Sequence, residues 1–211
     1  MGGQEEPEEC IVMTNISDLH MIETADSVVA YSDIGAHDRL EWFAISAPFR
    51  RELQARDYLQ AHGLECFLPM RYQLVDAGYG KKKRELRPAV PSMLFVRSQR
   101  AYLQQIKKGQ SFIQYLTRPE GSRNVPIVVP EFQMKSFMRA IQNSLDSFLY
   151  FRPGEIDLRK GRRVRIIGGQ LDGVEGVFMR VKGARTRRLV IMLEGLGAVA
   201  AEVSPDYVEL I

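Results

Sequence analysis

Residues 164–177 read VRIIGGQLDGVEGV, a stretch in which glycines separate short apolar segments. In residues 164–167 successive side chains point to opposite faces of a strand, which places Val164 and Ile166 on its inner side. The first pair of glycines allows the chain to turn with positive φ, and the last two permit a tight return into a second strand. The residues that carry this pattern are Val164, Ile166, Gly168, Gly169, Gly173 and Gly176. The stretch therefore predicts two strands joined by a glycine turn.

The sequence around this stretch continues the same pattern. Apolar segments at 174–181, 188–193, 198–203 and 207–211 are separated by turn residues, and no helical period is visible. Several short strands within about fifty residues predict a small closed β-barrel over residues 159–211. The preceding residues 146–158 contain Pro153-Gly154 and mixed polar and aromatic residues, which is typical of a linker.

Residues 41–145 show both helical and strand periods. Strands are predicted at 42–45, at 64–75 with an interruption at Pro69, at 88–97 and at 112–117, with a short apolar run at 125–129. Helices are predicted from Phe49 to Gly63, with Phe49, Leu53, Tyr58 and Leu59 on one face, at 98–108, and at 131–145 with Phe132 among the residues available for burial. This order predicts an α+β domain, an antiparallel sheet with its helices on one face.

The charge distribution is uneven along the chain. Residues 1–40 contain one basic and nine acidic residues, whereas residues 41–151 contain seventeen basic and nine acidic ones. The acidic leader, 1–40, is expected to be a partly disordered tail, and the basic body suits contact with nucleic acid or an acidic protein. With no apolar run of about 20 residues and only Cys10 and Cys66, we expect a cytoplasmic monomer without membrane contact or disulfides.

Catalytic and metal-binding sites are not indicated. His20, His37 and His62 are scattered, and no base is spaced to activate Cys66. His62 and Cys66 would need two further ligands to hold a metal. We therefore predict a binding protein with no enzymatic activity, no metal and no cofactor.

The glycine-rich stretch, together with the basic approach at 159–163, resembles the KOW motif. The alternative is an SH3-like barrel whose glycines serve only the turns. The first domain resembles the NusG amino-terminal domain: residues 42–45 match its aromatic first strand, 67–69 its second-strand proline and 90–96 its third strand. This resemblance implies a ferredoxin-like βαββαβα domain followed by an SH3-like barrel, and a factor of transcription elongation.

In the NusG family the amino-terminal domain binds the clamp helices of the largest RNA polymerase subunit. The resemblance places that contact at Val90, Pro91, Ser92 and Met93. Two of these residues, Val90 and Met93, are also apolar strand residues, so the sheet core is the alternative place for them.

A basic hairpin is predicted between the second and third strands, in the position where specialised family members place a loop near upstream or non-template DNA. Adjacent cations displace counterions from phosphates, and a tyrosine can stack on an unpaired base. The candidate residues are Tyr79, Lys81, Lys82, Lys83, Arg84 and Arg87. A solvated hairpin tip without nucleic-acid contact is the alternative.

In the carboxy-terminal domain, the turn at Leu196 resembles the loop with which the family recruits a ribosomal small-subunit protein or a termination factor. One specialised relative refolds this domain into helices, but Gly195 and Gly197 disfavour a helix here. We therefore predict that the domain remains a barrel.

The acidic leader, the residues around Met93 and the lysine-rich hairpin favour a specialised antiterminator, similar to those of long operons for surface or capsular polysaccharides. Two alternatives remain: a housekeeping NusG-type factor and a ribosome-associated KOW protein that binds RNA.

Overall fold

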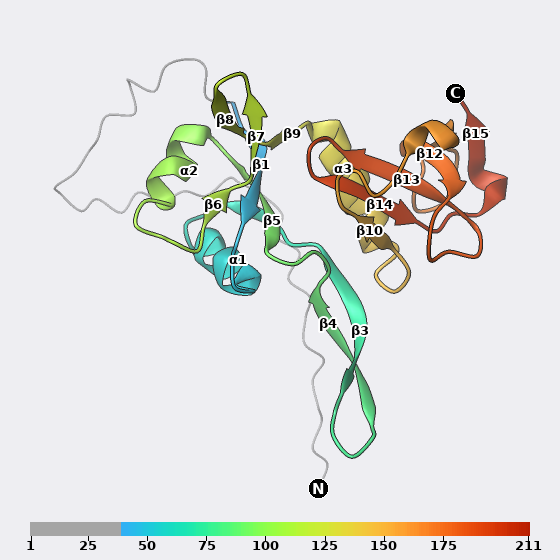
Figure 1. The fold of residues 1–211 in the computed structure, drawn as a ribbon, viewed down its shortest axis with the longest axis horizontal. Helices are drawn as coiled ribbons and strands as arrows, with labels where there is room; N and C mark the ends of the chain where they lie inside the picture. Colours follow the sequence, from blue (N-terminus) through green and yellow to red (C-terminus); the bar gives the residue numbers. More distant parts are fainter. Residues whose placement is uncertain (1–38) are drawn as a thin grey trace, which may run out of the picture. The chain divides into compact units, whose positions relative to one another are not determined.

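The structure, a computed structural model, describes residues 39–211 (Figure 1). Its first part is an antiparallel sheet with the strand order β2-β5-β1-β6, to which β9 adds by pairing with β1. The strands are β1 (Glu41–Ser46), β2 (Glu65–Phe67), β5 (Met93–Ser98), β6 (Gln114–Tyr115) and β9 (Val128–Val129). We call this the amino-terminal sheet. Strand β1 is central because β5 pairs along the whole length of one edge, and β6 and β9 pair with its other edge.

Both faces of the amino-terminal sheet are covered. Phe43 and Ile45 of β1 pack in one cluster with residues of α1 (Glu52–Ala61) and α2 (Arg100–Ile106). Their neighbours Trp42 and Ala44 pack in a second cluster with α3 (Glu131–Gln142). The expectation that all helices lie on one face is therefore wrong. The sequence of β1 is apolar at four successive positions, which is the pattern of a strand buried on both faces.

Helix α1 begins later than predicted. Phe49 and Arg50 have φ values of 62° and 57°, so the chain turns before the helix starts. Phe49 is 86% exposed and Leu53 is 43% exposed, and the buried face is formed by Glu52, Ala55 and Leu59. The predicted apolar face thus contained two residues that point away from the core.

Two hairpins extend from this part of the chain. The longer one joins β3 (Met70–Asp76) to β4 (Lys82–Pro88), and the shorter joins β7 (Thr117–Glu120) to β8 (Arg123–Pro126). Pro69 separates β2 from β3, so the predicted interruption divides the second strand into two elements.

The carboxy-terminal part forms a six-stranded antiparallel sheet with the order β10-β14-β13-β12-β11-β15, here called the carboxy-terminal sheet. Its strands are β10 (Leu149–Phe151), β11 (Arg162–Ile166), β12 (Glu175–Arg180), β13 (Arg187–Leu193), β14 (Gly197–Ala201) and β15 (Val208–Leu210). Two 3-10 turns, η2 (Leu158–Lys160) and η3 (Pro205–Tyr207), precede β11 and β15. Strand β10 lies inside the segment predicted to be a linker, where Leu149, Tyr150 and Phe151 pair with β14.

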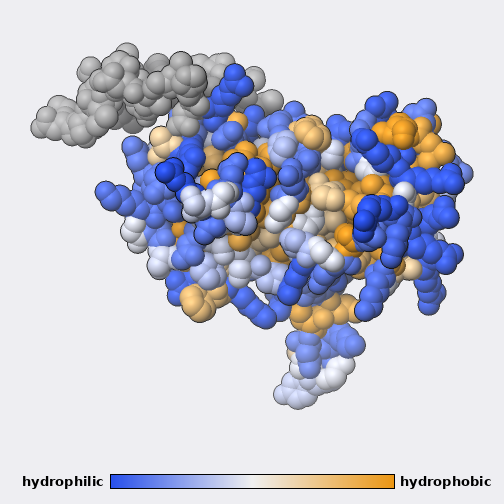
Figure 2. All heavy atoms as spheres, turned by 45° about the horizontal axis from the view of Figure 1, so that its top comes forward, coloured by the Kyte–Doolittle hydropathy of each residue, from blue (hydrophilic) through white to orange (hydrophobic). Residues whose placement is uncertain are grey.

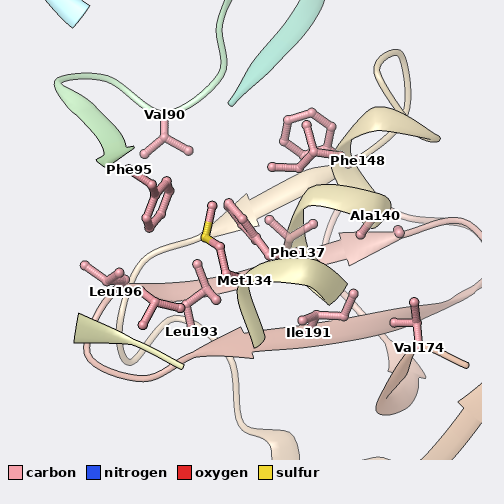
Figure 3. Close-up of a cluster of buried hydrophobic side chains, with 14 of the residues drawn as sticks. Val90, Phe95, Met134, Phe137, Ala140, Phe148, Val174, Ile191, Leu193 and Leu196 are labelled. Carbon is pink, nitrogen blue, oxygen red and sulfur yellow. The ribbon is translucent and has the colours of Figure 1, made fainter. Parts of the chain in front are cut away.

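Helix α3 packs against both sheets. Its buried residues Met134, Phe137, Ala140 and Ile141 recur at three- and four-residue spacing. The Phe137 ring lies 5.3 Å from that of Phe95 in β5. The same cluster includes Ile191, Leu193 and Leu196 of the carboxy-terminal sheet and its turn, as Figure 3 shows. Residues 41–145 and 159–211 thus share one continuous apolar core, the α3 core.

Candidate functional site

Of the four residues predicted to contact polymerase, Val90, Pro91 and Ser92 lie in the turn that leads into β5, and Met93 is the first residue of β5. We call these four residues the polymerase strip. Val90 is 2% exposed and Met93 is 9% exposed, and both belong to the α3 core. Pro91 is exposed and Ser92 is half-buried. The strip therefore presents one exposed residue, and its two apolar residues occupy the core position that the sequence left open as the alternative.

The backbone of this turn is fixed by contacts that the sequence did not reveal. Ser92 has a φ of 59°, a left-handed conformation that is uncommon for a residue other than glycine. Its carbonyl oxygen accepts a hydrogen bond of 2.9 Å from the Ala47 amide, and its own amide donates to the Glu52 carboxylate. Glu52 is 3% exposed. A buried carboxylate on α1 thus holds the turn in a strained conformation.

Glu52 had no recognisable signal in the sequence, because an acidic residue in the first turn of a helix is usually solvated and favoured there by the helix dipole. Only the packing of α1 under the turn brings its carboxylate to the Ser92 amide.

The β3–β4 hairpin carries all six residues of the predicted nucleic-acid surface, and it is covered mainly by hydrophilic residues (Figure 2). At its tip the Asp76 carboxylate accepts a 2.8 Å hydrogen bond from the Gly78 amide, and Tyr79 lies fully exposed with a φ of 52°. The cations from Lys82 onward lie on β4, so successive side chains point to opposite faces. They do not form one continuous surface.

Several of the hairpin cations are neutralised within the chain. One guanidinium nitrogen of Arg84 donates to both carboxylate oxygens of Asp146, each at 2.6 Å. The same guanidinium lies 3.8 Å from the centre of the Tyr72 ring. Lys83 and Arg87 lie 3.7 and 3.3 Å from the Glu85 carboxylate. Among residues 39–211, no ion pair involves Lys81 or Lys82. Of the five predicted cations, Lys81 and Lys82 are therefore the two whose charge is not paired within the described residues.

The glycine-rich stretch connects β11 to β12 as predicted, with Val164 and Ile166 buried. Gly168 and Gly169 have φ values of 91° and 69°, and a Cβ on either would meet the Tyr207 ring at about 3.4 Å. The Asp172 carbonyl at the end of the turn accepts a 2.8 Å hydrogen bond from Arg139 of α3. The turn is thus bound to α3 as well as shaped by its glycines.

Leu196, the predicted partner loop, is buried rather than exposed. It is 3% exposed and belongs to the α3 core. Its carbonyl accepts a 2.5 Å hydrogen bond from the Tyr150 hydroxyl. The adjacent Glu194 lies 3.6 Å from Arg118 of β7, and the Cβ position of Gly195 lies 3.5 Å from Ile127. The Leu196 turn is therefore not exposed to a partner, because it packs on the amino-terminal part of the chain.

Cys66 and His62 have structural contacts. Burial raises the pKa of the Cys66 thiol to about 12, despite the opposing charge of Arg56, so the reactive thiolate is scarce at neutral pH. The His62 Nδ1 lies 2.8 Å from the Tyr58 carbonyl oxygen.

Within residues 39–211, no group of three or more His, Cys, Asp or Glu could hold a metal. His20 and His37 lie outside the described residues. No helix in residues 39–211 is long and apolar enough to cross a membrane.

The role of Glu52 can be tested by Glu52→Gln, which keeps the size of the side chain and removes its charge. We expect the free energy of unfolding to fall by about 1–2 kcal/mol, because a hydrogen bond to a charged acceptor contributes roughly 1.5–3 kcal/mol. Urea unfolding measures this change, and hydrogen exchange of the Ser92 amide should become faster. The control is Asp57→Asn, an exposed residue of the same helix. Equal effects of both substitutions would contradict the assignment.

Comparison with known proteins identifies the first part of the chain. Residues 40–138 match the family model described as "Transcription termination factor nusG". No curated protein matches the chain. One matching solved structure is described as "Domain interaction in Thermotoga maritima NusG"; it is 17% identical, with a TM-score of 0.44, over 82% of this chain and 98% of that chain. The chain is thus similar to the NusG family over residues 40–138, slightly less than half of its length.

Proposed function

We propose that this chain is a transcription elongation and antitermination factor that binds RNA polymerase through residues 41–145. The observation that carries this proposal is the match of residues 40–138 to the NusG family model. Binding would be its only activity, without catalysis, metal or cofactor. The proposed contact is Val90, Pro91, Ser92 and Met93 against the clamp helices of the largest subunit.

The burial of this strip adds a condition to the proposal. Pro91 is accessible in the described conformation, whereas Val90 and Met93 lie in the core that α3 shares with the carboxy-terminal sheet. Full contact then requires a state in which this core opens. A protein whose binding-competent state is a minor population shows an affinity reduced by that fraction. In this proposal, the packing of the carboxy-terminal sheet lowers the affinity for polymerase.

Pro91→Asp tests the proposed contact. Because Pro91 is exposed, the substitution should leave the fold intact while placing a charge in the polymerase contact. We expect the Kd for purified RNA polymerase to rise at least about tenfold, equivalent to roughly 1.4 kcal/mol. Biolayer interferometry with the full chain measures it. Pro153→Asp, at an exposed loop in the carboxy-terminal half, is the control and should not change the Kd. A Pro91→Asp variant that binds as tightly as the control would refute the contact.

Leu196→Glu tests the proposed opening. The substitution places a carboxylate in a buried position of the α3 core, where an unpaired charge is strongly disfavoured. The open state should gain population, and the affinity for polymerase should increase at least about fivefold. The control is Met192→Glu in the same sheet, whose side chain is half exposed. Unchanged or weaker binding by a variant that circular dichroism shows to be folded would exclude this mode of regulation.

The hairpin is proposed as a second contact, to upstream or non-template DNA. Lys81 and Lys82 would supply phosphate contacts, with Tyr79 stacking on an unpaired base. Lys81→Gln/Lys82→Gln should weaken binding to an elongation complex at 50 mM salt by several-fold, with a smaller effect at 300 mM. The control is Lys108→Gln/Lys160→Gln, two exposed lysines outside the hairpin. Equal losses in both double variants would assign the effect to net charge alone.

The target operons form the most specific part of the proposal. We place the chain among antiterminators of long operons such as those for polysaccharide synthesis, because of its acidic leader and lysine-rich hairpin. Partners for the carboxy-terminal domain are a ribosomal small-subunit protein or a termination factor, reached after Leu196 is uncovered. Mapping polymerase occupancy with and without the protein distinguishes this role from a housekeeping factor, which would act on most genes. Copurification with ribosomes in high salt, without polymerase binding, would instead support the ribosome-associated alternative.

A further inference from the structure

A cleft at one end of the carboxy-terminal sheet collects arginines that the proposed polymerase contact does not use. It lies where the end of β12, the β12–β13 turn and the chain after β14 meet, and it encloses about 650 Å³. Volumes of roughly 300–1,000 Å³ are typical of ligand clefts. Its walls include Phe178, Arg180, Arg185, Arg187 and Glu202. We call it the arginine cleft.

The three arginines of the arginine cleft have no ion-pair partner among residues 39–211. The neighbouring Arg188 differs, because its guanidinium donates to the Ser147 carbonyl and lies 3.9 Å from the Glu202 carboxylate. The only acidic residue lining the cleft therefore already has a cation beside it. The net charge of the cleft is positive.

The strand register brings two of these arginines together. Arg180 of β12 is directly opposite Arg187 of β13. Like charges placed opposite one another on adjacent strands destabilise a sheet. A polyanionic ligand would relieve this repulsion, since guanidinium groups bind phosphate oxygens in a bidentate manner.

An aromatic ring completes the arginine cleft. Phe178 lies two residues before Arg180 and so shares its face of β12. It is half-buried and lines the cleft. Bases of single-stranded nucleic acid stack on such rings while basic groups follow the phosphates. A paired base cannot reach a ring inside a cleft without leaving the duplex. An acidic peptide would use the arginines but not the ring.

We propose that the arginine cleft binds single-stranded nucleic acid, with phosphates on Arg180, Arg185 and Arg187 and a base stacked on Phe178. The site is separate in residues from the proposed polymerase strip and from the β3–β4 hairpin. It does not depend on either of those proposals.

The test measures binding of the full-length chain to fluorescein-labelled 12-mers by anisotropy, with RNA, DNA of the same sequence and the DNA duplex as ligands. Arg180→Gln/Arg185→Gln/Arg187→Gln should weaken single-strand binding at least about tenfold. The slope of log K against log salt should fall by about 2, since each phosphate contact on a single strand contributes about 0.7. Phe178→Leu should weaken binding about five- to tenfold with little change in the slope.

The control variant is Arg51→Gln/Arg123→Gln/Arg152→Gln, which removes the same charge from exposed positions outside the cleft. It should retain wild-type affinity within about twofold. The proposal is overturned by equal losses in the two triple variants, by duplex binding as tight as single-strand binding, or by competition from poly-glutamate as effective as that from unlabelled oligomer. A preference for either RNA or single-stranded DNA supports the site. Tighter binding of RNA identifies the ligand as a transcript, and tighter binding of DNA identifies it as an exposed DNA strand.

Discussion

The packing of helix α3 between the two sheets is the interaction on which the rest of the structure depends. One side of the helix meets the amino-terminal sheet through Phe137 and Phe95, and the helix also contacts β13 and β14 of the carboxy-terminal sheet. Its four buried residues are all apolar, and burying such side chains contributes roughly 1.5–3 kcal/mol each. Separating the sheets would expose part of this surface to water. The burial of Val90, Met93 and Leu196 follows from this packing.

Local patterns predicted most of the strands and helices. The glycine-rich stretch correctly indicated β11, β12 and the turn between them, because positive φ values and alternating burial are local properties. The four apolar residues of β1 correctly indicated a strand but were assigned to a sheet with one covered face. A strand is buried on both faces only if an element packs on each of them. For β1 the second face is covered by α3, which is about ninety residues away in the sequence.

The candidate site was predictable in outline and not in its contacts. The basic hairpin was predicted, but β4 (Lys82–Pro88), which carries four of the six candidate residues, was not predicted as a strand. The pairing of Arg84 with Asp146 joins residues 62 positions apart. Glu52 and Ser92 are 40 positions apart. Such pairs depend on tertiary packing and leave no periodic trace in the sequence. Leu196 was assigned to a partner loop because the turn resembles the loop of the NusG family, whereas in the structure this turn packs against Ile127 and the α3 core.

The short segment from Leu145 to Phe151 connects the hairpin to the carboxy-terminal sheet. The Leu145 carbonyl accepts a hydrogen bond from the Tyr72 amide, Asp146 holds Arg84, and the Ser147 carbonyl accepts from Arg188 before β10 joins β14. Seven residues thus anchor two elements that carry different surfaces. Because Asp146 and Ser147 are adjacent, the carboxylate that pairs with Arg84 of the hairpin and the carbonyl that accepts from Arg188 of the sheet lie on neighbouring residues. The contacts of the hairpin and of the carboxy-terminal sheet therefore depend on one short stretch of backbone.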